Sequence, residues 1–511
     1  MTAGGAAGRI GRARRNAVDV RGSLALVGML LKYLSLASLV PTGFALGYGE
    51  PVWPFLAAGA IAAGVGWSLE RGLGGASSIG FREGYLVVSL TWVAVALFGA
   101  LPYLFSGEPQ LDRPLDALFE SMSGFTTTGA TVVVDIESLD RSLLMWRQFT
   151  QWLGGMGIIV LALAVLPRLR VGGRQLLESE LPGPEIDQLA DRIRDTARRL
   201  WLLYVALTAA LVLILLAIGG VGLDDRMGPF EAVAHGLTTM PLGGFSTESR
   251  SLELFAPVTQ WVIVAFMVLA GLNFALLYRA IVRRRPGALF HDDEARLLGG
   301  LLLFTTVIVF VDLVQADLVG GWPALRHAAF QTTSMMTGTG YAVSDYNTWP
   351  TLAVLAMVGV MFLGASAGSP SGSVKILRHL LVGRLLRREL RQTIHPELVV
   401  PVRLNHRPVD ERTLRAVLAF VLLYIGIFIV GAAILAIDAR LSDVQLGVTE
   451  AIAASAATLG NVGPAFGFAG PMGTYEPFSD GSTLAMTFLM WIGRLEVLPV
   501  LVLLTRNYWR V

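Results

Sequence analysis

The chain has 511 residues, of which 54% are hydrophobic and 15% are charged, and its mean hydropathy is +0.61. This composition excludes an ordinary soluble protein and is typical of a polytopic membrane protein. A formal net charge of +2 gives no reason to expect a nucleic-acid partner, and the absence of cysteine excludes disulfides, thiolate metal ligands and cysteine nucleophiles.

Ten apolar runs are long enough to cross a bilayer, which takes roughly 20 residues for each span. They lie near 23–48, 51–69, 84–105, 143–167, 199–221, 257–281, 297–319, 350–382, 413–437 and 483–507. With a cytoplasmic N-terminus, most Lys and Arg residues fall in cytoplasmic connections, as the positive-inside rule requires. The first run is too long for a cleaved signal core and should stay in the membrane as an anchor. We therefore expect a multi-pass plasma-membrane protein.

After the first two runs, the chain passes four times through one order of elements: a long apolar run, a short segment, a glycine-bearing loop and a second long run. The short segments are Pro114–Phe125, Pro229–Met240, Pro323–Met336 and Val444–Ala457. Because they are too short to span, they predict re-entrant half-helices. An ionisable residue stands 13 positions before each key glycine, in the first turns, where an acid complements the helix dipole; a direct part in ion entry is the alternative. These residues are Asp116, Glu231, His327 and Glu450.

Four loops in register predict a fourfold arrangement around one axis, in which backbone carbonyls replace the water shell of a monovalent cation. Glycine permits the backbone angles that turn successive carbonyls the same way. The expected fold is an all-α polytopic membrane protein, with two N-terminal transmembrane helices and four helix–pore loop–helix units around a central cation pore. The N-terminal part covers 1–79, and the four repeats cover 80–170, 171–285, 286–395 and 396–511.

The run at 350–382 is interrupted near mid-membrane by small and helix-breaking residues, and Lys375 ends the interruption. Broken membrane helices usually line a cavity, whereas the alternative is close packing of small residues between helices. The glycines of this segment, 363–375, are Gly364, Gly368 and Gly372.

Arg494 is the lone cation deep in the last apolar run. An intramembrane arginine costs at least ~2.5 kcal/mol and must find acceptors in the protein interior. Glu496 lies on a different helix face and is a poor partner. Carbonyls of the 364–373 segment, or alternatively an ion-repelling role at a pore constriction, explain Arg494 better. Lys32 in the first run is interpreted as a snorkelling residue or a helix contact.

Two strings carry a resemblance to a known family. Ser123–Thr131 reads SGFTTTGAT, and Gln151–Ile159 reads QWLGGMGII. With Gly243–Thr247 and Asn461–Pro464, they resemble the Trk, Ktr and HKT superfamily of potassium transporters over 80–511. The two extra N-terminal runs are more similar to the Trk-type membrane subunit than to the Ktr type. The resemblance implies a channel-like potassium-uptake subunit of the bacterial inner membrane and an intramembrane gate loop at 363–375, with Lys375 and Arg494 in the gate region.

The resemblance also implies the residues of a selectivity filter. They are Thr127, Thr128, Gly129, Leu242, Gly243, Gly244, Gly338, Thr339, Gly340, Asn461, Val462 and Gly463. Glycine rather than serine at 129 argues for potassium over sodium. Ala465 and the Gly338–Tyr341 loop depart from the usual family pattern, which leaves the strictness of selectivity open.

The family further implies a homodimer in the membrane and a cytosolic ring of nucleotide-binding, RCK-type regulators similar to TrkA. Potassium is then the substrate, and no cofactor is expected on this chain, because no phosphate loop or dinucleotide fingerprint opens a strand–helix unit. A secondary carrier that couples potassium to sodium or proton entry is the alternative. An enzyme is not expected, because the apolar runs contain no paired acids, His–Glu set or Ser–Lys dyad.

Overall fold

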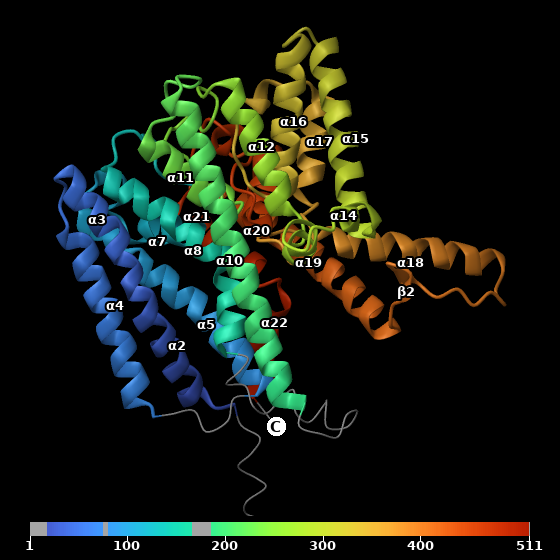
Figure 1. The fold of residues 1–511 in the computed structure, drawn as a ribbon, viewed down its shortest axis with the longest axis horizontal. Coiled ribbons are helices and arrows are strands. Elements are labelled where there is room, and N and C mark those ends of the chain that lie inside the picture. The colour runs from blue at the N-terminus through green and yellow to red at the C-terminus, as the bar shows by residue number, and fades with distance from the viewer. Residues whose placement is uncertain (1–17, 75–79, 166–184, 510–511) are drawn as a thin grey trace, which may run out of the picture.

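The structure is a computed structural model that describes residues 18–74, 80–165 and 185–509 (Figure 1). The regular elements of its described residues are helices, apart from one hairpin of strands β1 (Arg403–Leu404) and β2 (Arg407–Pro408), in which Arg403 pairs with Pro408. The prediction of an all-α polytopic membrane protein is confirmed. The expected boundaries at 79 and 170–171 lie outside the described residues.

The N-terminal helices form a layer on one side of the molecule (Figure 1). They are α2 (Val20–Leu34), η1 (Ser35–Ser38), α3 (Leu39–Tyr48) and α4 (Trp53–Gly72). Asp19 caps α2 by accepting a hydrogen bond from the Gly22 N–H. Lys32 forms an ion pair with Glu70 across α2 and α4, so its helix contact is an ionic one.

The remaining helices follow the fourfold order that the sequence predicts. The first group is α5 (Phe81–Gly99), α6 (Leu101–Ser106), η2 (Pro109–Leu111), α7 (Pro114–Phe125) and α8 (Arg141–Val165). The second is α10 (Glu185–Gly220), α11 (Pro229–Thr239), α12 (Pro257–Gly271) and α13 (Phe274–Ile281). The third is α14 (Gly287–His291), α15 (Asp293–Gln315), α16 (Gly321–Thr337), η3 (Tyr346–Thr348), α17 (Thr351–Met361) and α18 (Ile376–Ile394). The fourth is α19 (Glu411–Leu441), α20 (Val448–Gly460), η4 (Gly467–Ala469), α21 (Asp480–Arg494), α22 (Leu498–Leu504) and α23 (Arg506–Trp509).

Each predicted apolar run coincides with a helix or a group of helices, but not all are plain spans. Among the described residues, 5 helices are long and apolar enough to cross a membrane, or up to 7 with bent pairs counted. The bent pairs are α12 with α13, at 109°, and α21 with α22, at 114°. The run at 350–382 divides into α17, a non-helical segment and the start of the arginine-rich α18.

The four short helices α7, α11, α16 and α20 lie at the centre of a closed ring. The helix that follows the glycine loop in one group packs against the short helix of the next: α8 on α11, α12 on α16, and α17 on α20. The cycle closes because α21 of the last group packs on α7 of the first. Side-chain packing between groups, rather than the covalent order alone, therefore brings the four glycine loops together.

Two of the short helices begin elsewhere than expected. Helix α16 starts at Gly321, so His327 is its seventh residue and lies beyond the first turn. The helix dipole acts mainly on charges within the first turn, so it does not explain an ionisable residue at 327. Helix α20 starts at Val448 rather than at 444, after the extended Gly447. Asp116, Glu231 and Glu450 do lie in the first turns of α7, α11 and α20.

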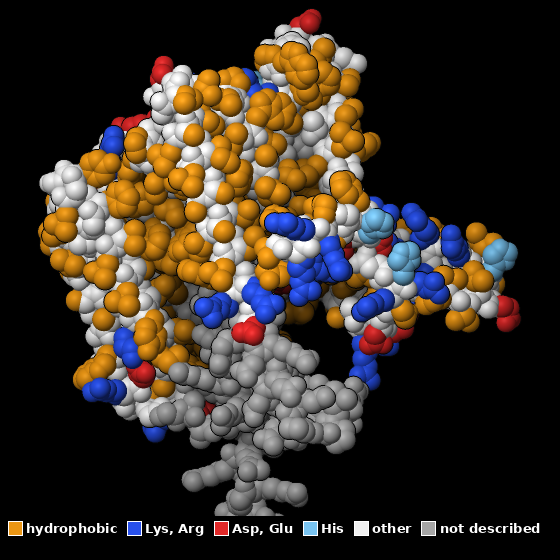
Figure 2. All heavy atoms as spheres, viewed as in Figure 1, with side chains coloured by type: hydrophobic (Ala, Val, Ile, Leu, Met, Phe, Trp, Pro, Cys, Tyr) orange, Lys and Arg blue, Asp and Glu red, His pale blue; other side chains and the backbone are white. Residues whose placement is uncertain are grey.

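Figure 2 shows how side-chain types divide over the surface. Hydrophobic side chains cover the face formed by α4, α10 and α12, as expected where lipid tails replace water. Lys and Arg gather below this face and along α18, which projects from the body as an arm (Figures 1 and 2). This asymmetry agrees with the charge pattern that predicts the cytoplasmic side.

Candidate ion-binding site

All four short helices end in the same way. In each, the residue after the last turn has a left-handed backbone conformation. Its N–H donates to the carbonyl three residues earlier, and the N–H of the following residue donates to the carbonyl five residues before it. The left-handed residues are Thr127, Leu242, Gly338 and Asn461, with φ of 55°, 58°, 74° and 51°. This is the Schellman ending, which normally uses glycine. Asparagine, like glycine, adopts this conformation readily, but for Thr127 and Leu242 it costs roughly 1–2 kcal/mol, so packing must hold these two turns in place.

The key glycines come two residues later and are left-handed as well. Gly129, Gly244, Gly340 and Gly463 have φ of 82°, 79°, 82° and 101°. A Cβ atom added to each would collide with a carbonyl oxygen of the next loop around the ring. The colliding oxygens belong to Gly243, Thr339, Val462 and Thr128, in that order, so the fourth loop meets the first. The twelve predicted filter residues therefore converge at one place, as four equivalent tips in contact.

Side chains from the surrounding helices hold these tips. Gln151 of α8 donates to the carbonyl of Gly243, 2.7 Å away, and accepts from the N–H of Phe245 at 3.1 Å. Asn461 donates through Nδ2 to Thr128 Oγ1 and to the Met490 carbonyl, both at 2.9 Å. These bonds satisfy buried polar groups that would otherwise carry a desolvation penalty, and they fix the loops in position. The sequence interpretation missed Gln151.

A small cavity of ≈ 50 Å³ opens directly beyond the glycine ring. Its lining includes Gly129, Gly244, Gly340, Arg147 and Glu248. Burial, and then the nearby carboxylate of Glu137, raise the pKa of Glu248 above its ordinary value of 4.5, against the attraction of Arg226. The cavity therefore lies between the glycine ring, the carboxylate of Glu248 and the buried guanidinium of Arg147.

The non-helical segment between Met361 and Ile376 lies against the inner side of the ring. A Cβ on Gly372 would collide with the Gly460 carbonyl, and one on Gly338 would lie 3.5 Å from Ser371 Oγ. The segment is folded on itself, since the Gly364 N–H bonds the Val374 carbonyl at 2.9 Å and Gly364 leaves no room for a side chain beside Gly372.

Two buried cations bind carbonyls of this segment. Lys375 Nζ donates to Ser369 O at 2.9 Å and to Ser371 O at 2.7 Å. Arg494 donates through Nη1 to the carbonyl of Pro370 and through Nη2 to Gly154 O, 2.7 Å away on α8. The Pro370 carbonyl lies in the segment expected to hold Arg494, whereas the Gly154 carbonyl on α8 was not expected. Glu496 instead forms an ion pair with Arg378.

The segment is also fixed by residues that the sequence interpretation missed. Glu294 Oε1 accepts from the Ala367 N–H at 2.6 Å and from the Leu377 N–H at 3.1 Å. Asn273, at the bend between α12 and α13, donates to Ala367 O at 2.7 Å, and Gly368 turns left-handed with φ of 77° against it. The position of Glu294 just before an apolar run could have indicated these contacts, because a buried carboxylate needs hydrogen-bond partners.

Comparisons with known proteins agree on one family. The TrkH family, described as a cation transport protein, matches residues 57–510. The potassium uptake protein TrkH of the Trk system from Salmonella typhimurium is 37% identical over 502 residues, covering 95% of this chain and 98% of its own. The potassium uptake protein TrkG of the Trk system from Escherichia coli is 33% identical, and the match covers 97% of this chain and 100% of TrkG. The crystal structure of the potassium transporter TrkH from Vibrio parahaemolyticus superposes with a TM-score of 0.84 at 30% identity, covering 96% of this chain and 100% of that one.

Proposed function

Because the chain belongs to the TrkH family of cation transport proteins, we propose that it takes up potassium across the bacterial inner membrane as a channel-like subunit. Potassium is the substrate, and its path runs through the ring of four glycine loops. The observation that carries the proposal is the closed contact of Gly129, Gly244, Gly340 and Gly463 with the carbonyls of the following loops. Such a ring can exchange a cation's water shell for backbone oxygens. Its relatives are named as uptake proteins, not as enzymes.

The segment at 363–375 is the gate in this proposal. Its Ser371 and Gly372 abut the ring at Gly338 and Gly460, so an ion leaving the ring toward α18 would meet them first. Lys375 and Arg494 hold the segment closed through its carbonyls. A barrier made of backbone held by two cations can open by a change in loop position, without rearrangement of the filter.

A cytosolic, nucleotide-binding regulator similar to TrkA would act on this gate, and a second copy of the chain would complete a dimer. Support for a regulator that acts on the gate comes from contacts that connect the gate segment to the arginine-rich helix α18 and the hairpin. The carboxylate of Asp293, next to Glu294, accepts from Arg384 on α18 at 2.9 Å and from the Asn405 N–H of the hairpin at 2.9 Å. A displacement of α18 or the hairpin would therefore reach Glu294 and Ala367.

Ion flux into proteoliposomes tests the proposed function. With potassium, rubidium, sodium and lithium gradients imposed one at a time, we expect passive potassium and rubidium flux well above sodium and lithium flux. Protein-free vesicles are the control. Flux that requires a sodium or proton gradient and saturates at a low rate would support the secondary carrier instead.

External acidification should slow uptake through Glu248. Because the pKa of Glu248 is raised, its carboxylate becomes protonated at a higher external pH than an ordinary glutamate does. The cavity then loses a negative charge. Glu248→Gln should lower neutral-pH uptake by about two- to threefold, a modest effect because solvent screens the charge, and should flatten the acidic limb. Glu253→Gln is the matched control, since Glu253 pairs with Arg250 and does not line the cavity. An unchanged pH profile in Glu248→Gln would contradict the prediction.

A further inference from the structure

Nine residues before its key glycine, each short helix carries a fully buried side chain. These residues are Glu120, His235, Gln331 and Ala454. In the first three repeats the side chain is polar and bonds the chain just after the glycine. The contacts are Thr131 Oγ1 to Glu120 at 3.0 Å, His235 Nε2 with Ser246 Oγ at 3.1 Å, and Gln331 Nε2 to Tyr341 O at 3.3 Å. In the fourth, where alanine has no polar atom, the Tyr475 hydroxyl donates to Gly463 O at 2.7 Å.

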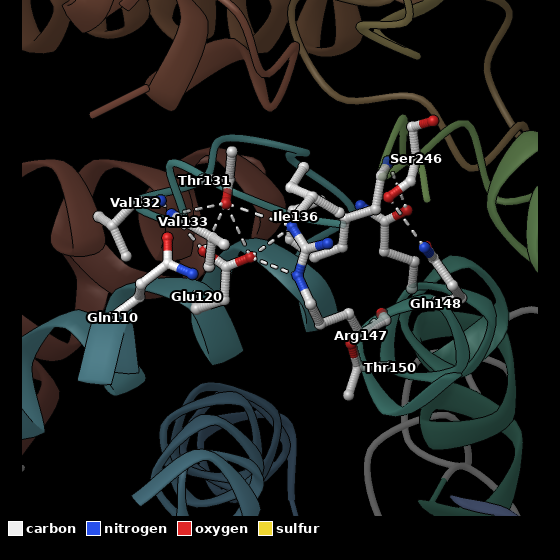
Figure 3. Close-up of polar contacts among 12 residues, drawn as sticks. Gln110, Glu120, Thr131, Val132, Val133, Ile136, Arg147, Gln148, Thr150 and Ser246 are labelled. Atoms are coloured by element: carbon white, nitrogen blue, oxygen red, sulfur yellow. Dashed lines mark hydrogen bonds and ion pairs between the residues drawn. The ribbon is translucent and has the colours of Figure 1, made fainter. Parts of the chain in front are cut away.

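The first of these positions differs because it carries a charge. Glu120 on α7 forms an ion pair with Arg147 on α8, both fully buried, and Arg147 Nε and Nη2 each lie 2.7 Å from Oε1 (Figure 3). Thr131 lies between them, donating to Glu120 and accepting from Arg147 Nη2 at 3.2 Å. A buried charge is tolerated only when it is paired and hydrogen-bonded, so each member fixes the position of the others.

The pair reaches three of the four loops. The guanidinium of Arg147 packs over the ring of Phe245, which directly follows Gly244, with Cζ 4.2 Å from the ring centroid. The carbonyl of Thr131 accepts the Tyr475 N–H at 2.8 Å, which ties in the fourth repeat. Arg147 also lines the outer cavity, and its Nη1 has no hydrogen-bond partner among the described residues.

We propose that Glu120 and Arg147 are positioning residues for ion selectivity. They hold the outgoing chains of repeats 1, 2 and 4 at the spacing that suits a dehydrated potassium ion. The pair is neutral as a whole, so it stiffens the ring without adding net charge beside the ions. The planar guanidinium bonds Glu120 and Thr131 while it stacks on Phe245, a combination that lysine cannot reproduce. The inference rests on the proposed ion path through the glycine ring.

Opposite charge changes separate positioning from electrostatics in the proteoliposome assay. Arg147→Met leaves an uncompensated negative charge and should lower the KM for potassium, whereas Glu120→Gln leaves a positive charge and should raise it, each by about tenfold. The double variant should bring the KM back toward the parent value. All three variants should lose the preference for potassium over sodium, because the ion pair between Glu120 and Arg147 is missing in each. Arg147→Lys should rescue the KM but not the preference.

Arg113→Met is the matched control, because the exposed Arg113 directly precedes α7, forms ion pairs with Asp116 at 3.5 Å and with the exposed Asp480 of α21, and should keep parent selectivity. If the charged variants fail to fold, Thr131→Val keeps the ion pair and removes its bridging hydroxyl, and it should still weaken selectivity measurably. A double variant, or Thr131→Val, with parent potassium preference would overturn the proposal. That failure is distinct from failure of the proposed function, in which the parent protein itself would not prefer potassium.

Discussion

Replacement of Gly129 by serine is expected to reduce the preference for potassium over sodium by about tenfold or more. The residue is left-handed, with φ of 82°, and an added Cβ would collide with the Gly243 carbonyl of the next loop. The ring can accept the side chain only if that carbonyl moves. A displaced carbonyl no longer matches the dehydration energy of potassium, so sodium should compete better. Flux of each ion into proteoliposomes, and competition between them, measures the change.

Gly107→Ser provides the matched control for this substitution. Gly107 is also left-handed, with φ of 77°, but nothing lies within 4 Å of a Cβ added there. Backbone strain is thus common to both variants, and only Gly129→Ser intrudes on another loop. A folded Gly129→Ser protein with the parent's potassium-to-sodium ratio would show that this loop is not part of the filter.

Substitution of Arg494 by alanine is expected to raise basal potassium flux by about tenfold, because the loss of one charge-assisted hydrogen bond is worth roughly 1.5–3 kcal/mol. The guanidinium is buried and joins Pro370 of the gate segment to Gly154 of α8. Its removal frees the segment and takes a positive charge from the ion path. Arg494→Lys should lie in between, since an ammonium lacks the fork of donors. Lys375→Ala combined with Arg494→Ala should raise flux further.

Arg378→Gln is the control for Arg494. It removes a neighbouring guanidinium that pairs with Glu496 and packs on Phe420, whereas the bond of Arg378 to the gate segment is made by its backbone N–H and is kept. Flux should remain near the parent value, and selectivity should persist in all of these variants because the ring is unchanged. Loss of flux in a folded Arg494→Ala protein would mean that Arg494 serves conduction, and the gate model would then have to be abandoned.

Much of the architecture is already determined by the sequence. Apolar run length and the fourfold return of short segment and glycine are local properties, because hydropathy and the backbone freedom of glycine act at each position. The class of partner for Arg494 also follows from the sequence, since a buried cation must find acceptors and Glu496 faces elsewhere. These arguments need no knowledge of which distant segments meet.

Only the tertiary structure decides which loop touches which and what supports them. The left-handed turns at Thr127 and Leu242 could not be read from residue type, because an isolated helix end would favour glycine or asparagine there. The bends of 109° and 114° fall within runs whose hydropathy is continuous. The contacts of Glu120 with Arg147, of Gln151 with Gly243 and of Glu294 with Ala367 join residues far apart in the chain. Periodicity and composition carry no record of such pairings, because the energy that fixes them arises only when packing removes the charges and amides from water.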